Sequence, residues 1–82
     1  MPVVILYAKA GCHLCDEARE YLEDLAASYN FTLDEIDIRR DETLFERYRY
    51  RIPVVTVDGV ERLEGRIAVE DVAVLGHEFS RR

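Results

Sequence analysis

The sequence has 82 residues, which suits one domain with an economical core, because a chain of this size buries only about 60% of the surface that its unfolded form exposes. Hydrophobic residues make up 49% and charged residues 34%, with four glycines and two prolines, and this composition argues against extensive disorder. The net charge of −6 argues against general binding to nucleic acid or to an acidic membrane surface, since both are negatively charged. We expect one domain over residues 1–82.

The amino-terminal apolar run resembles a buried strand rather than a targeting segment. Val3-Val4-Ile5-Leu6 has no basic region before it and no small-residue cleavage site after it, and no apolar run approaches membrane-spanning length. We therefore expect a cytoplasmic protein that binds neither a membrane nor nucleic acid. Five arginines between residues 39 and 51 do not change this expectation, because acidic residues interleave with them as on a solvated helix surface.

Hydrophobic periodicity predicts the first elements of the chain. Residues 3–7 form a continuous apolar run, which is typical of a central strand covered on both faces. From residue 12 or 13 to about residue 28, apolar residues recur at three- and four-residue steps and predict an amphipathic helix. Residues 31–38 are polar enough for an edge strand, with Ile36 and Ile38 facing inward.

The second half of the chain predicts a short helix, a hairpin and a last helix. Asp41 can cap a helix that runs to about residue 48. Strands over 54–57 and 60–63 flank Asp58-Gly59, a pair that suits a primed two-residue turn. A helix is predicted from about 68 to 79, locally weakened by a glycine. Its expected buried face is Val69, Val72, Ala73 and Phe79, with Gly76 as the weak point.

The predicted order is βαβαββα. Two strands joined through a helix should pair in parallel with a right-handed crossover, and the hairpin adds an antiparallel pair. We expect an α/β fold with a four-stranded mixed sheet and flanking helices.

Both cysteines of the chain lie in one C-x-x-C motif at a strand-to-helix junction, Cys12-His13-Leu14-Cys15. A thiol in the first turn of a helix faces unpaired N–H groups and the positive end of the dipole, so the pKa of Cys12 should fall below the free value of about 8.5. Cys15 lies nearly one turn later and is expected to be held deeper in the core. We expect Cys12 to be the nucleophile and Cys15 the resolving thiol of disulfide exchange.

Three alternatives remain open at this motif. Protonated His13 close to Cys12 would further favour the thiolate, whereas His13 could equally be an exposed first-turn residue. A metal site would need four ligands, yet beyond the motif the only other His or Cys is His77, so we expect no metal. The two cysteines could also be inert buried thiols, although such thiols rarely need a helix start.

The segment Tyr7-Ala8-Lys9-Ala10-Gly11-Cys12-His13-Leu14-Cys15 resembles the active-site segment of glutaredoxins, and Ile52-Pro53-Val54-Val55 resembles their loop with a cis-proline. The resemblance covers essentially the whole chain and is closest to small glutaredoxin-like proteins that carry G-C-x-L-C. It implies a thioredoxin-like fold of the glutaredoxin type. It also implies thiol–disulfide oxidoreductase activity.

The resemblance assigns further roles residue by residue. Lys9, the only lysine of the chain, matches a basic residue that helps to bind a glutathione carboxylate and to stabilise the thiolate. Pro53 matches the family's proline, and the backbone of Ile52 before it would pair with the substrate's cysteine. Without the resemblance we would expect a trans bond at this proline.

Two departures from the glutaredoxin pattern affect the substrate. His13-Leu14 replaces the usual Pro-Tyr, and Glu64-Gly65 followed by Ala68 replaces a Gly-Gly and an acidic residue that contact glutathione. The loss of these contacts to glutathione makes a protein dithiol or disulfide an equally reasonable substrate. We expect no permanently bound cofactor, a small thiol or a protein disulfide as substrate, with glutathione as one candidate co-substrate, and an unidentified reductant. We expect a monomer. The alternative function is a non-catalytic binding module, or a dithiol protein that shares a metal between chains.

Overall fold

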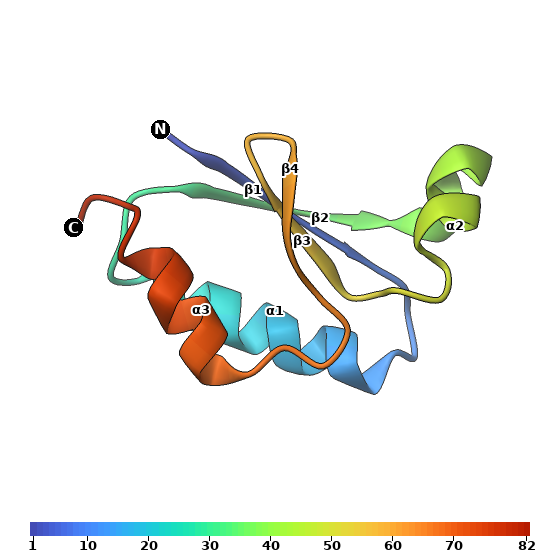
Figure 1. Ribbon diagram of the computed structural model, residues 1–82, viewed down its shortest axis with the longest axis horizontal. Helices are drawn as coiled ribbons and strands as arrows, with labels where there is room; N and C mark the ends of the chain where they lie inside the picture. The colour runs from blue at the N-terminus through green and yellow to red at the C-terminus, as the bar shows by residue number, and fades with distance from the viewer.

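The computed structural model describes residues 1–82, and its elements in chain order are β1 (Val3–Ala8), α1 (His13–Ala26), β2 (Thr32–Asp37), the 3-10 helix η1 (Ile38–Arg40), α2 (Glu42–Tyr48), β3 (Val54–Val57), β4 (Val60–Glu64) and α3 (Val69–Gly76). β1 pairs in parallel with β2 and antiparallel with β3, and β3 pairs antiparallel with β4. The sheet order is β2-β1-β3-β4, so β2 is an edge strand (Figure 1). This confirms the four-stranded mixed sheet that the sequence predicts.

Helices α1 and α3 lie along one face of the sheet, and α2 packs at one end of the sheet (Figure 1). Val4, Leu6 and Ala8 of β1 are buried in the main core together with residues of α1 and α3. Because successive side chains of a strand alternate, Tyr7 points to the other face. There its ring packs against that of Tyr48 in α2, with the ring centroids 4.8 Å apart. β1 is therefore a central strand, but the prediction that it is covered on both faces is confirmed for one face only, because Val3 is 39% exposed and Ile5 is half-buried on the other.

β2 ends one residue earlier than predicted. Ile38 begins η1 instead of ending the strand, although it is fully buried as expected. The cause is local, because the Asp37 carboxylate accepts the N–H of Arg39 at 2.9 Å and so caps η1. Asp41 then caps α2 as predicted, accepting the N–H groups of Thr43 and Leu44.

The predicted hairpin between β3 and β4 is confirmed. Asp58 and Gly59 both have positive φ, 49° and 84°, as a primed two-residue turn requires. The turn is also tied to the first strand, since the Val3 N–H donates to Asp58 Oδ1 at 2.9 Å.

α3 is shorter than predicted and packs through a different face. The prediction that Val69 and Ala73 are buried is wrong, since Val69 is 50% exposed and Ala73 is exposed. The buried positions follow the spacing i, i+3, i+4, i+7, which defines one stripe of a helix and its continuation. These positions are Val72, Leu75, Gly76 and Phe79.

Gly76 lies where α3 approaches α1. A Cβ atom at this position would lie 2.7 Å from Leu25 Cδ1 and 3.2 Å from Tyr29 Cε2. The glycine therefore allows the two helices to come close, which the sequence-based interpretation of Gly76 as a weak point did not foresee.

Both chain ends lie at the opposite end of the sheet from the start of α1 (Figure 1). The amino terminus leads directly into β1. In the carboxyl-terminal segment, Arg81 forms an isolated antiparallel β-bridge with Tyr29, which lies just before β2. No helix combines the length and the apolar character needed to cross a membrane.

Candidate active site

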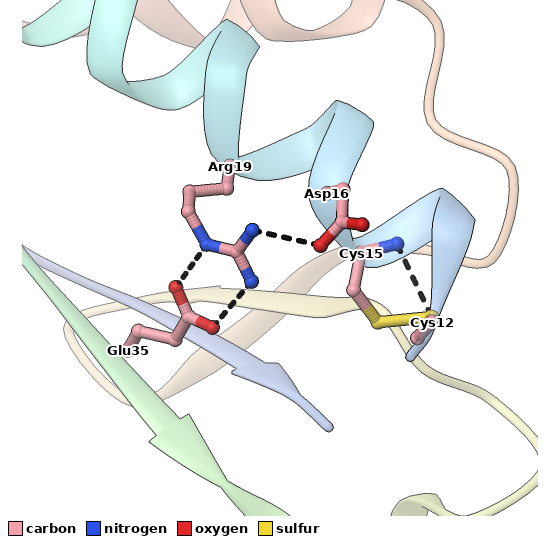
Figure 2. Close-up of a disulfide and its surroundings, with 5 residues drawn as sticks. All are labelled: Cys12, Cys15, Asp16, Arg19 and Glu35. Atoms are coloured by element: carbon pink, nitrogen blue, oxygen red, sulfur yellow. Dashed lines mark hydrogen bonds and ion pairs between the residues drawn. A yellow bond between two sulfur atoms is a disulfide. The ribbon is translucent and has the colours of Figure 1, made fainter. Parts of the chain in front are cut away.

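Cys12 and Cys15 are joined by a disulfide at the start of α1, just beyond the carboxyl end of β1 (Figure 2). Gly11, with φ of 80°, turns the chain from the strand into the helix. Cys12 is the N-cap residue of α1, and its Sγ accepts the N–H of Cys15 at 3.2 Å. The sulfur thus takes the place that a serine or aspartate oxygen usually has at a helix N-terminus.

The two sulfurs differ in exposure. Cys15 is 0% exposed and belongs to the core with Ala18 and Leu22 of the same helix. Cys12 is only partly buried and packs against the edge of this core. An incoming reagent can therefore reach Cys12 more easily than Cys15.

His13 is directed along the helix surface. Its side chain is 88% exposed, and its Nε2 lies 3.3 Å from Glu17 Oε2, one turn further along α1. Of the two alternatives for His13, this geometry favours an exposed first-turn residue.

Lys9 lies in the exposed connection between β1 and α1, three residues before Cys12. No carboxylate forms an ion pair with it in the folded chain. Its ammonium group is therefore available to a ligand at the end of the sheet where α1 begins.

Pro53 lies at the same end of the sheet as Cys12, because Val54 pairs with Tyr7 near the end of β1. The Ile52-Pro53 bond is cis, and Pro53 is fully buried. The N–H of Ile52 donates to the Tyr48 carbonyl at 3.0 Å. This differs from the expectation that both backbone groups of Ile52 face a substrate, because only the carbonyl has no hydrogen bond within the chain.

A second network holds the segment before Pro53. Tyr48 Oη donates to Glu61 Oε2 at 2.9 Å, and the Arg51 guanidinium bridges Glu61 and Glu64 of β4. The hydrogen bonds from Arg51, and then that from Tyr48, lower the pKa of Glu61, whereas burial raises the pKa of the Tyr48 phenol.

Four of the five arginines between residues 39 and 51 have ion-pair partners, as expected for a solvated charged surface; these are Arg39, Arg47, Arg49 and Arg51.

An ion-pair network beside the disulfide was not predicted (Figure 2). Arg19 of α1 donates to both carboxylate oxygens of Glu35 in β2, at 2.5 and 2.7 Å, and to Asp16 Oδ1 at 2.8 Å. The three-residue spacing of Asp16 and Arg19 could have indicated half of this network. The partner Glu35 could not be predicted from sequence spacing, because it comes close to Arg19 only when β2 pairs with β1 beside α1.

No group of three or more histidine, cysteine, aspartate or glutamate side chains is arranged to hold a metal ion. The geometry of the cysteine pair, by contrast, is compatible with redox function, since the two cysteines lie within disulfide distance on a helix start.

Comparison with known proteins agrees with the fold. Two solved bacterial structures are similar over most of the chain. A structural-genomics target protein from X. campestris is 28% identical, with a TM-score of 0.73, and the match covers 92% of this chain and 96% of the other. Protein Ne2328 from Nitrosomonas europaea is 26% identical, with a TM-score of 0.75, and the match covers 90% of this chain and 89% of the other. The thioredoxin of Plasmodium falciparum is similar in fold alone, with 17% identity, a TM-score of 0.73, and coverage of 99% of this chain and 74% of that one. The fold is thus thioredoxin-like, as expected.

A family model described as "Glutaredoxin-like domain (DUF836)" matches residues 3–75, which includes the C-x-x-C motif, the cis-proline and the hairpin. The chain therefore belongs to the glutaredoxin-like domain family.

Proposed function

We propose that this protein is a thiol–disulfide oxidoreductase in which Cys12 is the nucleophile and Cys15 is the resolving thiol. One observation carries the proposal: the Cys12 sulfur accepts an N–H group at the start of α1 and is partly exposed, whereas Cys15 is fully buried. In the reduced protein, the same N–H and the helix dipole favour a thiolate at Cys12.

The reaction proceeds in two exchanges. The Cys12 thiolate attacks one sulfur of a substrate disulfide, and the other sulfur leaves as a thiolate that takes up a proton from water. Cys15 then loses its proton and attacks Cys12 Sγ, which forms the intramolecular disulfide and releases the second substrate thiol. The substrate gains two electrons and two protons, and the cysteine pair loses them.

A thiol reductant must restore the dithiol form. Two molecules of glutathione would suffice, the first forming a mixed disulfide with Cys12 and the second leaving with it as oxidised glutathione. Lys9 is available for a carboxylate of this co-substrate. Ala68, at the position where glutaredoxins have an acidic residue, makes no side-chain hydrogen bond at the start of α3. A protein disulfide, whose extended strand could donate to the Ile52 carbonyl beside Pro53, is therefore an equally suitable substrate.

The test is the catalysed reduction of a protein disulfide by an excess of small thiol. Cys12→Ser should abolish the acceleration. Cys15→Ser is the matched control, because it also removes the intramolecular disulfide, yet it should still form a mixed disulfide at Cys12 that accumulates when the small thiol is omitted and is visible by mass spectrometry. Retained turnover in Cys12→Ser would overturn the proposal.

The alternative is a non-catalytic module that binds a partner or shares a metal between chains through the two thiols. Such a module would show no turnover in the wild-type protein, and zinc would change its sedimentation from monomer to dimer. A catalytic protein of the cytoplasm should remain a monomer and turn over in the absence of metal.

A further inference from the structure

The network of Asp16, Arg19 and Glu35 lies directly beside the redox pair (Figure 2). Asp16 follows Cys15 in the chain, and Arg19 lies four residues after Cys15, hence on the same side of α1 one turn later. The guanidinium holds one carboxylate from its own helix and, through two hydrogen bonds, a second from the edge strand. Both carboxylates are thereby paired with a single positive charge.

The Asp16 carboxylate would act against the reaction if it stood alone. A negative charge near a thiol disfavours the thiolate, and Asp16 lies in the same first turn of the helix whose dipole stabilises Cys12. The other charged side chains at this end of the sheet are Lys9 before α1, His13 and Glu17 on α1, Asp37 at the end of β2 with Arg39 and Arg40 after it, and Arg66 after β4. Of these, His13 is paired with Glu17, and Asp37 with Arg39.

We propose that Arg19 is a positioning residue for thiol–disulfide exchange, which neutralises Asp16 and ties the redox end of α1 to β2. This inference rests on the proposed function of Cys12. The chain contains a similar arrangement without a redox group, in which Arg62 of β4 binds Glu78 through two hydrogen bonds, and the exposed fractions of Arg62 and Arg19 are 34% and 32%. The second ion pair serves as an internal control.

The experiment measures the thiolate of Cys12 directly. In a Cys15→Ser background, the ultraviolet absorbance of the thiolate is followed against pH for the parent and for Arg19→Met. The midpoint should rise by about half a pH unit in Arg19→Met, so that the thiolate fraction below the midpoint falls about threefold, because the Asp16 carboxylate in the first turn of α1 loses its counter-charge. Arg62→Met should leave the midpoint in place.

Two rescue variants separate charge from simple loss of structure. Arg19→Lys keeps the positive charge and should recover most of the midpoint. Asp16→Asn in the Arg19→Met background removes the unpaired charge and should do the same, although it restores no ion pair. Thermal unfolding of each variant verifies that the fold is retained.

An unchanged midpoint in Arg19→Met, or a rise that Asp16→Asn does not reverse, would overturn the inference. The titration requires no catalytic turnover, so it decides the role of Arg19 even if the reductase assay of the proposed function fails. Conversely, if the wild-type protein reduces disulfides but Arg19→Met has an unchanged thiolate midpoint, the proposed function stands and Arg19 has no role in it.

Discussion

The backbone N–H of Cys15 donates to the Sγ of Cys12 across 3.2 Å. In the disulfide form, the backbone of the residue assigned as the resolving thiol therefore binds the sulfur of the residue assigned as the nucleophile. Because the donor belongs to the backbone, replacement of the Cys15 side chain leaves it in place. The two cysteines can thus be separated by experiment without removal of the group that favours the Cys12 thiolate.

Alkylation of the reduced protein at neutral pH should modify Cys12 at least about tenfold faster than Cys15, because Cys12 alone combines exposure with the helix terminus. Partial alkylation followed by mass spectrometry of the peptides measures both rates. Cys15→Ser should react as fast as the parent, and Cys12→Ser should react slowly. Equal rates at the two sites would contradict the assignment of roles.

Thr56→Val should stabilise the protein. Thr56 is 3% exposed, and its Oγ1 has no hydrogen-bond partner, so a polar group is buried without compensation. Valine has the same shape without the hydroxyl, and the free energy of unfolding should rise by about 1 kcal/mol, or roughly 4–8 °C in Tm. Thr56→Ser, which keeps the hydroxyl and loses the methyl group, should be less stable than the parent. A drop in Tm for Thr56→Val would show that the hydroxyl is satisfied.

Gly76→Ala should destabilise the protein even though alanine is the better helix former by about 1 kcal/mol. The added methyl group would meet Leu25 at 2.7 Å. The steric origin predicts coupling: in a double-mutant cycle with Leu25→Ala, the two changes should be less harmful together than their sum by about 1 kcal/mol. Chemical denaturation measures all four free energies. Additive effects would locate the cost elsewhere than in the contact between α1 and α3.

Acid should weaken the protein in part through Asp37. Hydrogen bonds from the Arg39 side chain lower the pKa of this carboxyl from 3.8 to about 2 in the folded state. A lowered pKa means that the contribution to stability is complete above the unfolded value and is lost as the pH falls from 3.8 towards 2. The Tm of the wild-type protein should therefore exceed that of Asp37→Asn at about pH 6, and this difference in Tm should vanish near pH 2.

The control for this titration is Asp34→Asn, which removes an equal charge from the same strand at a residue that forms no ion pair. Salt should reduce the effect at Asp37, because the pair with Arg39 is exposed. A constant difference between wild type and Asp37→Asn across the range would disprove the contribution of this ion pair.

Local patterns were sufficient to predict most of the fold. The apolar run of β1, the cap at Asp41 and the Asp58-Gly59 turn each depend on neighbouring residues, and each was confirmed. The buried face of α3 was mispredicted because the helix carries apolar residues on more than one of its sides. Only its contact with α1, which needs Gly76, selects the stripe that is buried.

The redox pair could likewise be found from spacing and position, since a C-x-x-C at a strand-to-helix junction is a local signal. Its surroundings could not. Glu35 of β2 pairs with Arg19 of α1, and the N–H of Ile52 donates to the carbonyl of Tyr48 at the end of α2. Both interactions depend on how the chain packs in three dimensions. The cis bond at Pro53 was anticipated only through the resemblance to glutaredoxins.

The two ends of the chain and the redox pair occupy opposite poles of the sheet (Figure 1). A linker attached at either terminus should therefore anchor the protein to an electrode or a bead with Cys12 facing the free solution. In such an oriented layer, every copy would present its thiol to a diffusing disulfide. Attachment through the exposed Lys9, by contrast, would turn the thiol towards the support.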